Sequence, residues 1–169
     1  MLTEPITLPP RGVPAEAAEL HDILTDIVQL SGRVTRLATR ATQDPETPAT
    51  WRTLAVLQQH GPMRLGELAR LSNVAQPTMT KIVAGLVERD WVKRIADQDD
   101  ARAWQIGISS KGVTVLTEWR AKLATTLLPM FEDLPDADVQ TLRKAVDLLR
   151  PRIELGSAAA ALQSGKDDH

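Results

Sequence analysis

Residues 75–89 combine an apolar helical stripe with a group of short polar side chains. The apolar residues recur at intervals of three and four, which predicts a helix with one buried face. This stripe consists of Met79, Ile82, Val83, Leu86 and Val87. Pro77 suits the first helical turn, where a missing N–H costs nothing, so the helix is predicted to begin near residue 75 or 76. Its outward-facing start then carries Gln76, Thr78, Thr80 and Lys81. Small polar side chains with one cation suit contacts to base edges and phosphates in a DNA major groove.

The elements beside this helix are those of a winged helix-turn-helix. Upstream, residues 65–72 place three leucines on one side of a short helix, and residues 73–74 leave room only for a sharp turn. Downstream, residues 91–96 and 103–108 are rich in β-branched and aromatic side chains, which predicts a two-stranded hairpin. Residues 97–102 are then the wing loop.

A long helix is predicted over residues 15–41, and its apolar residues repeat at intervals of seven. A narrow seam with this period is typical of two packed helices, so we expect it to pair with a second copy of the chain. The seam comprises Leu20, Ile27 and Val34, and the last helix offers a matching row of Val139, Leu142, Val146 and Leu149. The alternative is that the first helix only covers its own domain, because Leu24 beside Ile23 widens the apolar stripe.

The remaining signals define the domain boundaries. Thr47 and Pro48 predict the start of a helix that ends before Gly61, and Ser109 or Ser110 predicts the cap of another that Pro129 ends or kinks. The fold class is therefore mainly α, a winged helix-turn-helix with a small β-hairpin wing and terminal helices that form a dimerisation arm. Its predicted parts are a flexible arm at 1–14, a helical dimerisation region at 15–47 and 110–155, a DNA-binding domain at 48–109 and a flexible tail at 156–169. Pro151 should kink or end the last helix.

The amino-acid composition excludes several classes of protein and of functional site. The chain has 169 residues, no cysteine and a net charge of −2, so disulfides and thiolate metal sites are excluded. No apolar run is long enough to span a bilayer and no signal-peptide pattern opens the chain, so we expect a cytoplasmic protein without membrane contact. The three histidines are too scattered for a metal motif, and no nucleophile elbow or phosphate-binding glycine loop is present. We therefore expect no enzyme activity, no cofactor and no metal.

The order of these motifs resembles the MarR family of bacterial transcriptional regulators over nearly the whole chain apart from its two ends. The most specific features are the wing pattern of Asp97, Asp100 and Arg102 and the stretch from Ser109 to Gly112 after the second strand. Asp90 stands where the family usually has glycine after the recognition helix, so it is expected to adopt the left-handed conformation.

The resemblance implies a homodimeric, sequence-specific DNA-binding regulator of double-stranded palindromic DNA, most simply a repressor. It implies that Arg102 enters the minor groove with Asp100 holding its guanidinium. The candidate DNA contacts are Gln76, Pro77, Thr78, Thr80, Lys81, Lys93, Arg94, Asp100 and Arg102. It further implies a small aromatic or anionic effector at the junction of arm and winged helix, where Trp51 and Trp119 are candidate contacts, although tryptophans at helical spacing are more often core.

The competing hypothesis is a winged-helix protein-interaction module without specific DNA binding. The acidic net charge is its main support, since binding to phosphates requires many cations. Residues 64–111 carry eight basic and six acidic residues, so even this segment is only slightly basic.

Overall fold

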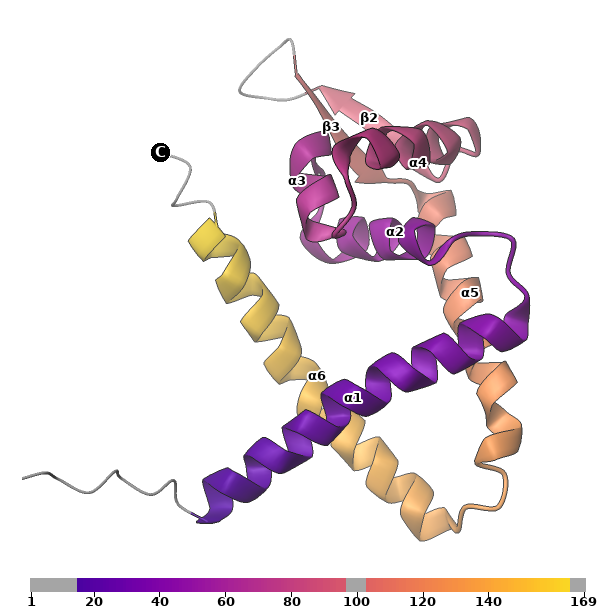
Figure 1. The fold of residues 1–169 in the computed structure, drawn as a ribbon, viewed down its shortest axis with the longest axis vertical. Helices are drawn as coiled ribbons and strands as arrows, with labels where there is room; N and C mark the ends of the chain where they lie inside the picture. The colour runs from indigo at the N-terminus through magenta and orange to yellow at the C-terminus, as the bar shows by residue number, and fades with distance from the viewer. Residues whose placement is uncertain (1–14, 97–102, 165–169) are drawn as a thin grey trace, which may run out of the picture.

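A computed structural model of the chain describes residues 15–96 and 103–164 (Figure 1). The elements follow in the order α1 (Ala15–Thr42), α2 (Pro48–His60), β1 (Met63–Arg64), α3 (Leu65–Leu71), α4 (Gln76–Glu88), β2 (Val92–Ala96), β3 (Trp104–Ile108), α5 (Ser110–Leu127), the 3₁₀ helix η1 (Leu128–Met130) and α6 (Asp136–Ser164). The mainly helical fold with a small antiparallel sheet confirms the predicted fold class.

The core lies within the winged helix-turn-helix, between α2, α3, α4, the sheet and the start of α5 (Figure 1). The periodic apolar residues of α4 are buried there, with Met79 and Leu86 fully inaccessible and Val83 nearly so. Leu54 and Leu57 of α2 and Leu116 of α5 complete the centre of this cluster. Because the core takes one face of α4, the opposite face of that helix is left for solvent.

The sheet has the strand order β1-β3-β2, and both pairings are antiparallel. Strands β2 and β3 form the predicted wing hairpin, in which Val92 pairs with Ile108 and Ala96 with Trp104. The two-residue strand β1 adds to the other side of β3, with Met63 opposite Ile106. The hairpin therefore begins beside the end of α4, and its far end lies at Ala96 and Trp104.

Local capping signals place the helix ends as the sequence predicted. Thr47 accepts a hydrogen bond from the Thr50 backbone N–H at the start of α2, and Gly61 ends that helix with φ 80°. The Ser109 side chain caps α5 by accepting from the Gly112 backbone N–H at 2.9 Å. A Cβ at Gly112 would lie 2.1 Å from the Trp91 carbonyl oxygen, so only glycine lets α5 start so close to the hairpin.

The end of α4 confirms the expectation for Asp90, which has φ 60°. Its backbone N–H bonds the Val87 carbonyl at 3.0 Å, and the N–H of Trp91 bonds the Leu86 carbonyl at 2.9 Å. These two bonds form a Schellman motif, the usual helix end with a left-handed residue. The Ser109 hydroxyl also donates to the Asp90 carbonyl at 2.6 Å, which ties this turn to the start of α5.

Asp90→Gly is expected to raise the free energy of unfolding by about 0.5–1 kcal/mol, because glycine adopts positive φ without a Cβ clash. Urea denaturation followed by circular dichroism measures the change. Ala84→Gly, at an exposed helical position of α4, serves as the control and should lower stability by about 1 kcal/mol. Equal destabilisation by both substitutions would contradict the account of this turn.

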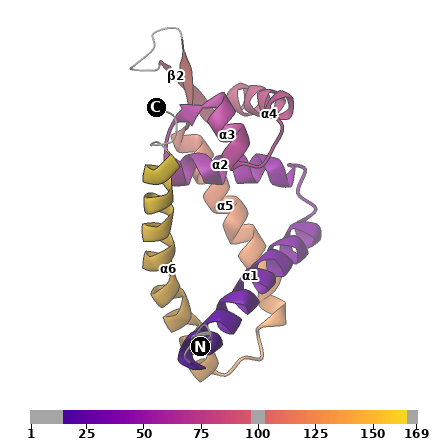
Figure 2. The same ribbon diagram turned by 60° about the vertical axis from the view of Figure 1, so that its left-hand side comes forward.

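The arm is made of α1, α5 and α6. Helix α1 packs across α5, and its Ala38 is buried against the rest of the chain. Figure 2 shows α6 diverging from α1 and α5 along most of its length, so the three helices do not close into a bundle.

Pro151 was expected to kink or end the last helix, and the helix does not end there, because α6 continues with Pro151 inside it to Ser164. Proline removes one N–H from the helix but leaves the following bonds intact, and the alanines at 158–161 are the strongest helix formers. The helix therefore extends past residue 155, where the sequence placed the beginning of a tail.

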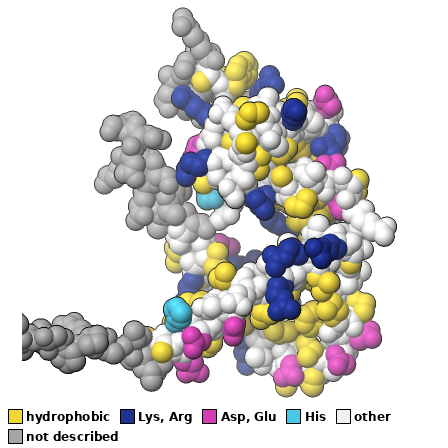
Figure 3. Space-filling model, viewed as in Figure 1, with side chains coloured by type: hydrophobic (Ala, Val, Ile, Leu, Met, Phe, Trp, Pro, Cys, Tyr) yellow, Lys and Arg dark blue, Asp and Glu magenta, His cyan; other side chains and the backbone are white. Residues whose placement is uncertain are grey.

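The arm also carries most of the uncovered apolar surface. Among the described residues, every large hydrophobic side chain classed as exposed, except Trp104, belongs to α1, α6 or the segment at η1. Leu20 of α1 is 55% exposed and Val146 of α6 is 44% exposed. Yellow side chains gather over the lower end of the molecule in the space-filling view (Figure 3). None of the described helices is both long and apolar enough to cross a membrane.

Candidate nucleic-acid interface

The N-terminal turns of α4 present the predicted polar set to solvent. The helix begins at Gln76 with Pro77 in its first turn, and the described structure leaves the candidate contacts exposed. These are Gln76, Pro77, Thr78, Thr80 and Lys81. The Thr80 hydroxyl donates to the Gln76 carbonyl at 3.0 Å, so its donor is already used within the helix. Gln76 and Thr78 are therefore the better candidates for reading bases, and Lys81 can reach a phosphate.

The wing supplies a second set of cations. Lys93 and Arg94 are exposed on β2, directly before the wing loop. Trp104, opposite Ala96 at the far end of the hairpin, is 56% exposed. Asp100 and Arg102, the other predicted wing contacts, lie outside the described residues. Among described residues, the hairpin thus adds two exposed basic side chains to the polar set at the start of α4.

The turn between α3 and α4 sets the direction in which α4 leaves α3. Asn73 has φ 52°, a left-handed conformation that asparagine tolerates, and its backbone N–H bonds the Arg70 carbonyl at 3.1 Å. Ser72 is fully buried, and its carbonyl accepts a hydrogen bond from the Arg52 guanidinium at 3.2 Å. A side chain from α2 therefore holds the turn in place.

Arg89 stabilises the C-terminal end of α4 through three contacts. Its Nε donates to the Gly85 carbonyl at 2.9 Å, and its guanidinium lies 4.2 Å from the ring centroid of Trp91. The same guanidinium forms an ion pair with Glu46, in the loop between α1 and α2. Helix α4, the hairpin and the loop that follows the arm helix α1 are thus connected at one point, which restricts how α4 can move relative to the arm.

The candidate effector contacts meet in a stack of three tryptophans. The rings of Trp51 and Trp119 are 4.8 Å apart between centroids and nearly parallel, and Trp51 stacks on Trp91 on its other side at 5.7 Å. Trp51 is only 4% exposed and donates from Nε1 to Asp44 at 3.3 Å, so it belongs to the core. The Nε1 of Trp119 is buried and has no acceptor in the described part of the chain. That unpaired donor keeps Trp119 as a candidate ligand contact.

One group of side chains was missed by the sequence reasoning. Arg36 and Arg40 of α1 and Arg52 of α2 line the same cavity, which no sequence motif joins. The spacing of four between Arg36 and Arg40 predicts one helix face, but the position of Arg52 opposite them depends on how α1 packs over α2. Within the described residues, no group of histidine and acidic side chains is placed to hold a metal.

Comparison with known proteins agrees with this geometry. Residues 47–104 match the model of the MarR family. The HTH-type transcriptional regulator YpoP of Bacillus subtilis is 30% identical over 89 residues, which span 53% of this chain and 63% of YpoP. The HTH-type transcriptional repressor IacR of Pseudomonas putida is 24% identical over 130 residues, or 76% of this chain and 77% of IacR.

A solved structure extends the likeness to the arm. The transcriptional regulator Tm0710 of Thermotoga maritima is 25% identical, with a TM-score of 0.62 over 83% of this chain and 98% of that one. All three of these proteins are named as regulators of transcription and none as an enzyme. As its motifs predicted, the winged helix-turn-helix of this chain matches the MarR family over residues 47–104.

Proposed function

We propose that the protein is a homodimeric, sequence-specific DNA-binding regulator of transcription, acting as a repressor on a palindromic operator. The observation that carries this proposal is the division of α4 into two faces. Met79, Val83 and Leu86 anchor it in the core, while Gln76 and Thr78 stand exposed at its start. A helix held this firmly with free hydrogen-bonding groups at its N-terminal end is suited to enter a major groove.

The apolar surface of the arm supports the dimer. Soluble proteins rarely leave large contiguous apolar surfaces uncovered, and here α1 and α6 both do so. A second copy with the same two faces would cover them symmetrically. Two recognition helices would then meet half-sites about one DNA turn apart, roughly 34 Å.

Repression and effector control are supported by different observations. The relative IacR is named a transcriptional repressor. The buried, unpaired Nε1 of Trp119 lies in the stack that joins α5 to α2 and the hairpin, where an effector with an acceptor atom would satisfy it. Such a ligand changes DNA affinity only if it prefers one arrangement of arm and reading helix over another.

A protein-interaction module is the second candidate, favoured by the net charge of −2. In that case the exposed start of α4 would meet another protein, and DNA affinity would be uniformly weak. Its prediction is therefore opposite to that of the regulator in a single binding assay.

Fluorescence polarisation with labelled DNA from beside the protein's own gene tests the proposal. We expect saturable binding that persists in excess unrelated DNA and weakens as salt rises. A scrambled duplex of equal composition is the control. Equal affinity for both duplexes would favour the interaction module over the regulator.

Arg102→Ala is expected to weaken operator binding by about tenfold, or about 1.4 kcal/mol, through loss of a minor-groove contact. Polarisation titrations on the same duplex measure this, with thermal unfolding to check the fold. Lys122→Ala, which removes an exposed cation from α5, is the charge control and should leave affinity within about twofold at matched salt. If both substitutions have the same small effect, Arg102 does no more than contribute general charge.

A further inference from the structure

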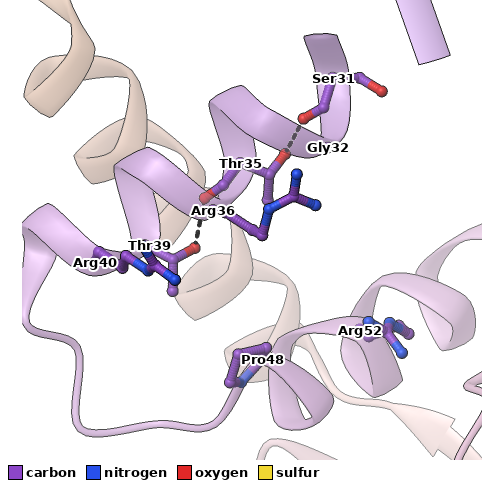
Figure 4. Close-up of a pocket in the computed structure, with 8 residues that line it drawn as sticks. All are labelled: Ser31, Gly32, Thr35, Arg36, Thr39, Arg40, Pro48 and Arg52. Carbon is purple, nitrogen blue, oxygen red and sulfur yellow. Dashed lines mark hydrogen bonds between the residues drawn. The ribbon is translucent and has the colours of Figure 1, made fainter. Parts of the chain in front are cut away.

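The loop of residues 43–47 is one of two chain connections between the arm and the winged helix-turn-helix. The other is α5, which contributes Leu116 to the core and also packs against α1. Figure 4 shows the loop leaving the end of α1 beyond Arg40 and reaching α2 at Pro48. A domain attached through one helix can pivot about it, so the contacts of this loop decide how firmly the two parts are held together.

Two carboxylates of the loop are bound by residues of the winged helix-turn-helix. Glu46 forms an ion pair with Arg89, which directly follows α4. Asp44 accepts a hydrogen bond from Nε1 of Trp51 on α2 at 3.3 Å and another from the backbone N–H of Glu46 at 2.8 Å. The Glu46 side chain is 20% exposed, so its ion pair is partly sheltered from water and is screened less than a surface pair.

The contacts of Arg89 continue through two tryptophans and return to the loop. The Arg89 guanidinium lies 4.2 Å from the ring centroid of Trp91. Trp91 stacks on Trp51 at 5.7 Å between centroids, and Trp51 is the residue that donates to Asp44. Asp44, Glu46, Trp51, Arg89 and Trp91 therefore form a closed set of contacts, which we call the loop clamp.

Local contacts place both partners of the ion pair in advance. The Nε of Arg89 donates to the Gly85 carbonyl at 2.9 Å, which holds the guanidinium at the C-terminal end of α4. On the loop side, Gln43 has φ 46° and Asp44 accepts from the N–H of Glu46, so the chain turns sharply where α1 ends. Ordering two free side chains is the main cost of a surface ion pair, and here that cost is reduced.

The ion pair is the part of the loop clamp that lies outside the hydrophobic core. Trp51 belongs to the core and Trp91 packs against it, so both stabilise the winged helix-turn-helix itself. Glu46 lies in the connecting loop instead, and Arg89 stands at the end of α4. A change at Glu46 therefore releases the loop from α4 without opening the core.

We propose that the ion pair of Glu46 and Arg89 closes a clamp that fixes the orientation of the winged helix-turn-helix relative to the arm, and that this makes DNA binding selective for the spacing between half-sites. Both are positioning residues, because they act through the place of α4. The clamping step stands without reference to DNA. The spacing step rests on the proposed function, since it requires two copies of α4 on one operator.

The clamping step is tested by the distance between α1 and α4 within one chain. The chain has no cysteine, so spin labels attach only at two introduced cysteines, Gln29→Cys and Ala84→Cys, both at exposed positions. Pulsed electron double resonance on labelled protein diluted with unlabelled protein reads the pairs within single chains. We expect a narrow distance distribution with Glu46 in place and about twofold greater width with Glu46→Gln, which removes the charge at nearly constant size.

Glu88→Gln is the matched control, because it removes the same charge from the exposed residue beside Arg89. No ion pair of Glu88 is present in the described part of the chain, so the width should not change. Arg89→Lys keeps the positive charge, but one ammonium cannot make all three contacts of the guanidinium, so the distribution should broaden. Thermal unfolding identifies a merely structural role, which would lower the Tm of Glu46→Gln and leave the width unchanged.

An unchanged width with Glu46→Gln, or equal broadening by Glu88→Gln, would overturn the clamp. If Glu46→Gln did not fold, an unchanged width with Arg89→Lys would overturn it in the same way.

The spacing step is tested by polarisation titrations on operator duplexes whose half-sites are moved apart by one or two base pairs. Each base pair shifts a half-site by about 3.4 Å and turns it by roughly 35° about the DNA axis, so a rigid dimer should bind the altered duplexes poorly. We expect Glu46→Gln to lower the preference for the natural spacing by about tenfold, while affinity for the natural duplex changes by less than about threefold.

Glu88→Gln should keep the full spacing preference. Equal preferences in Glu46→Gln and the unaltered protein would overturn the spacing step, and the spin-label distances would still decide the clamp. If no duplex bound specifically, the proposed function would fail, and the same distances would again decide whether Glu46 and Arg89 hold the winged helix-turn-helix to the arm.

Discussion

Val146→Asp is expected to convert the protein from a dimer into monomers and to lower operator affinity by at least about a hundredfold. Val146 is 44% exposed in the single chain, so aspartate there disturbs no core of the monomer. In a dimer the same carboxylate would be buried in the seam, where an unpaired charge is strongly disfavoured. Two linked half-site contacts gain about 10²–10⁴ in affinity over one, and a monomer loses that gain.

Ile27→Asp, on the facing row of α1, should have the same effect, although Ile27 is half-buried in the single chain and some loss of stability accompanies it. Multi-angle light scattering gives the mass at micromolar concentration, and polarisation gives the affinity. Gln140→Asp adds the same charge at an exposed polar position of α6 and should remain dimeric. A monomeric mass for the unaltered protein would refute the dimer directly.

Gln76→Ala and Thr78→Ala are each expected to cost about 1–3 kcal/mol in operator binding and to relax base preference. Both side chains are exposed at the start of α4, and no hydrogen bond of the Thr78 hydroxyl to another described residue occupies it. A glutamine can pair with adenine through two bonds, and a threonine can contact a base edge or a thymine methyl group. Thr80→Ala should cost less, because the Thr80 hydroxyl already donates within the helix.

Lys81→Ala should behave differently from these two. A phosphate contact weakens all sequences alike, so the slope of log affinity against log salt should fall by about one per subunit while preference is retained. Binding selections on randomised duplexes separate the two classes. Gln140→Ala, an exposed amide on α6, is the control for Gln76. If Gln76→Ala and Thr78→Ala both kept full affinity and selectivity, α4 would not be the reading helix.

The elements of the winged helix-turn-helix were predictable because local interactions define them. The start of α4 at Gln76, the caps at Thr47 and Ser109, and the left-handed Asp90 all depend on residues within one or two turns. Helix propensity, capping and apolar period act over the same range, so each can be deduced from neighbouring residues. The winged helix-turn-helix and its exposed polar face were therefore recoverable from the sequence alone.

The last helix shows where such local rules gave the wrong answer. Pro151 was expected to kink or end the helix, but α6 does not end there and continues to Ser164. The missing N–H of Pro151 removes one of the many backbone hydrogen bonds of α6. The helix-forming residues on both sides of it stabilise the helix by more than this loss.

Contacts between distant elements were decided only by tertiary packing. Trp51 stacks between Trp91 and Trp119 because α2, the hairpin and α5 converge, and nothing in their spacing along the chain shows it. Arg52 reaches Ser72 and also faces the arginines of α1, because the loop between α1 and α2 sets the gap between those helices. Sequence periodicity determines which face of a helix is apolar, whereas the partner of each face depends on packing across the whole chain. The polar face of α4 was thus determined by the sequence itself. The meeting of Arg36, Arg40 and Arg52 at one cavity was decided by the packing of α1 over α2.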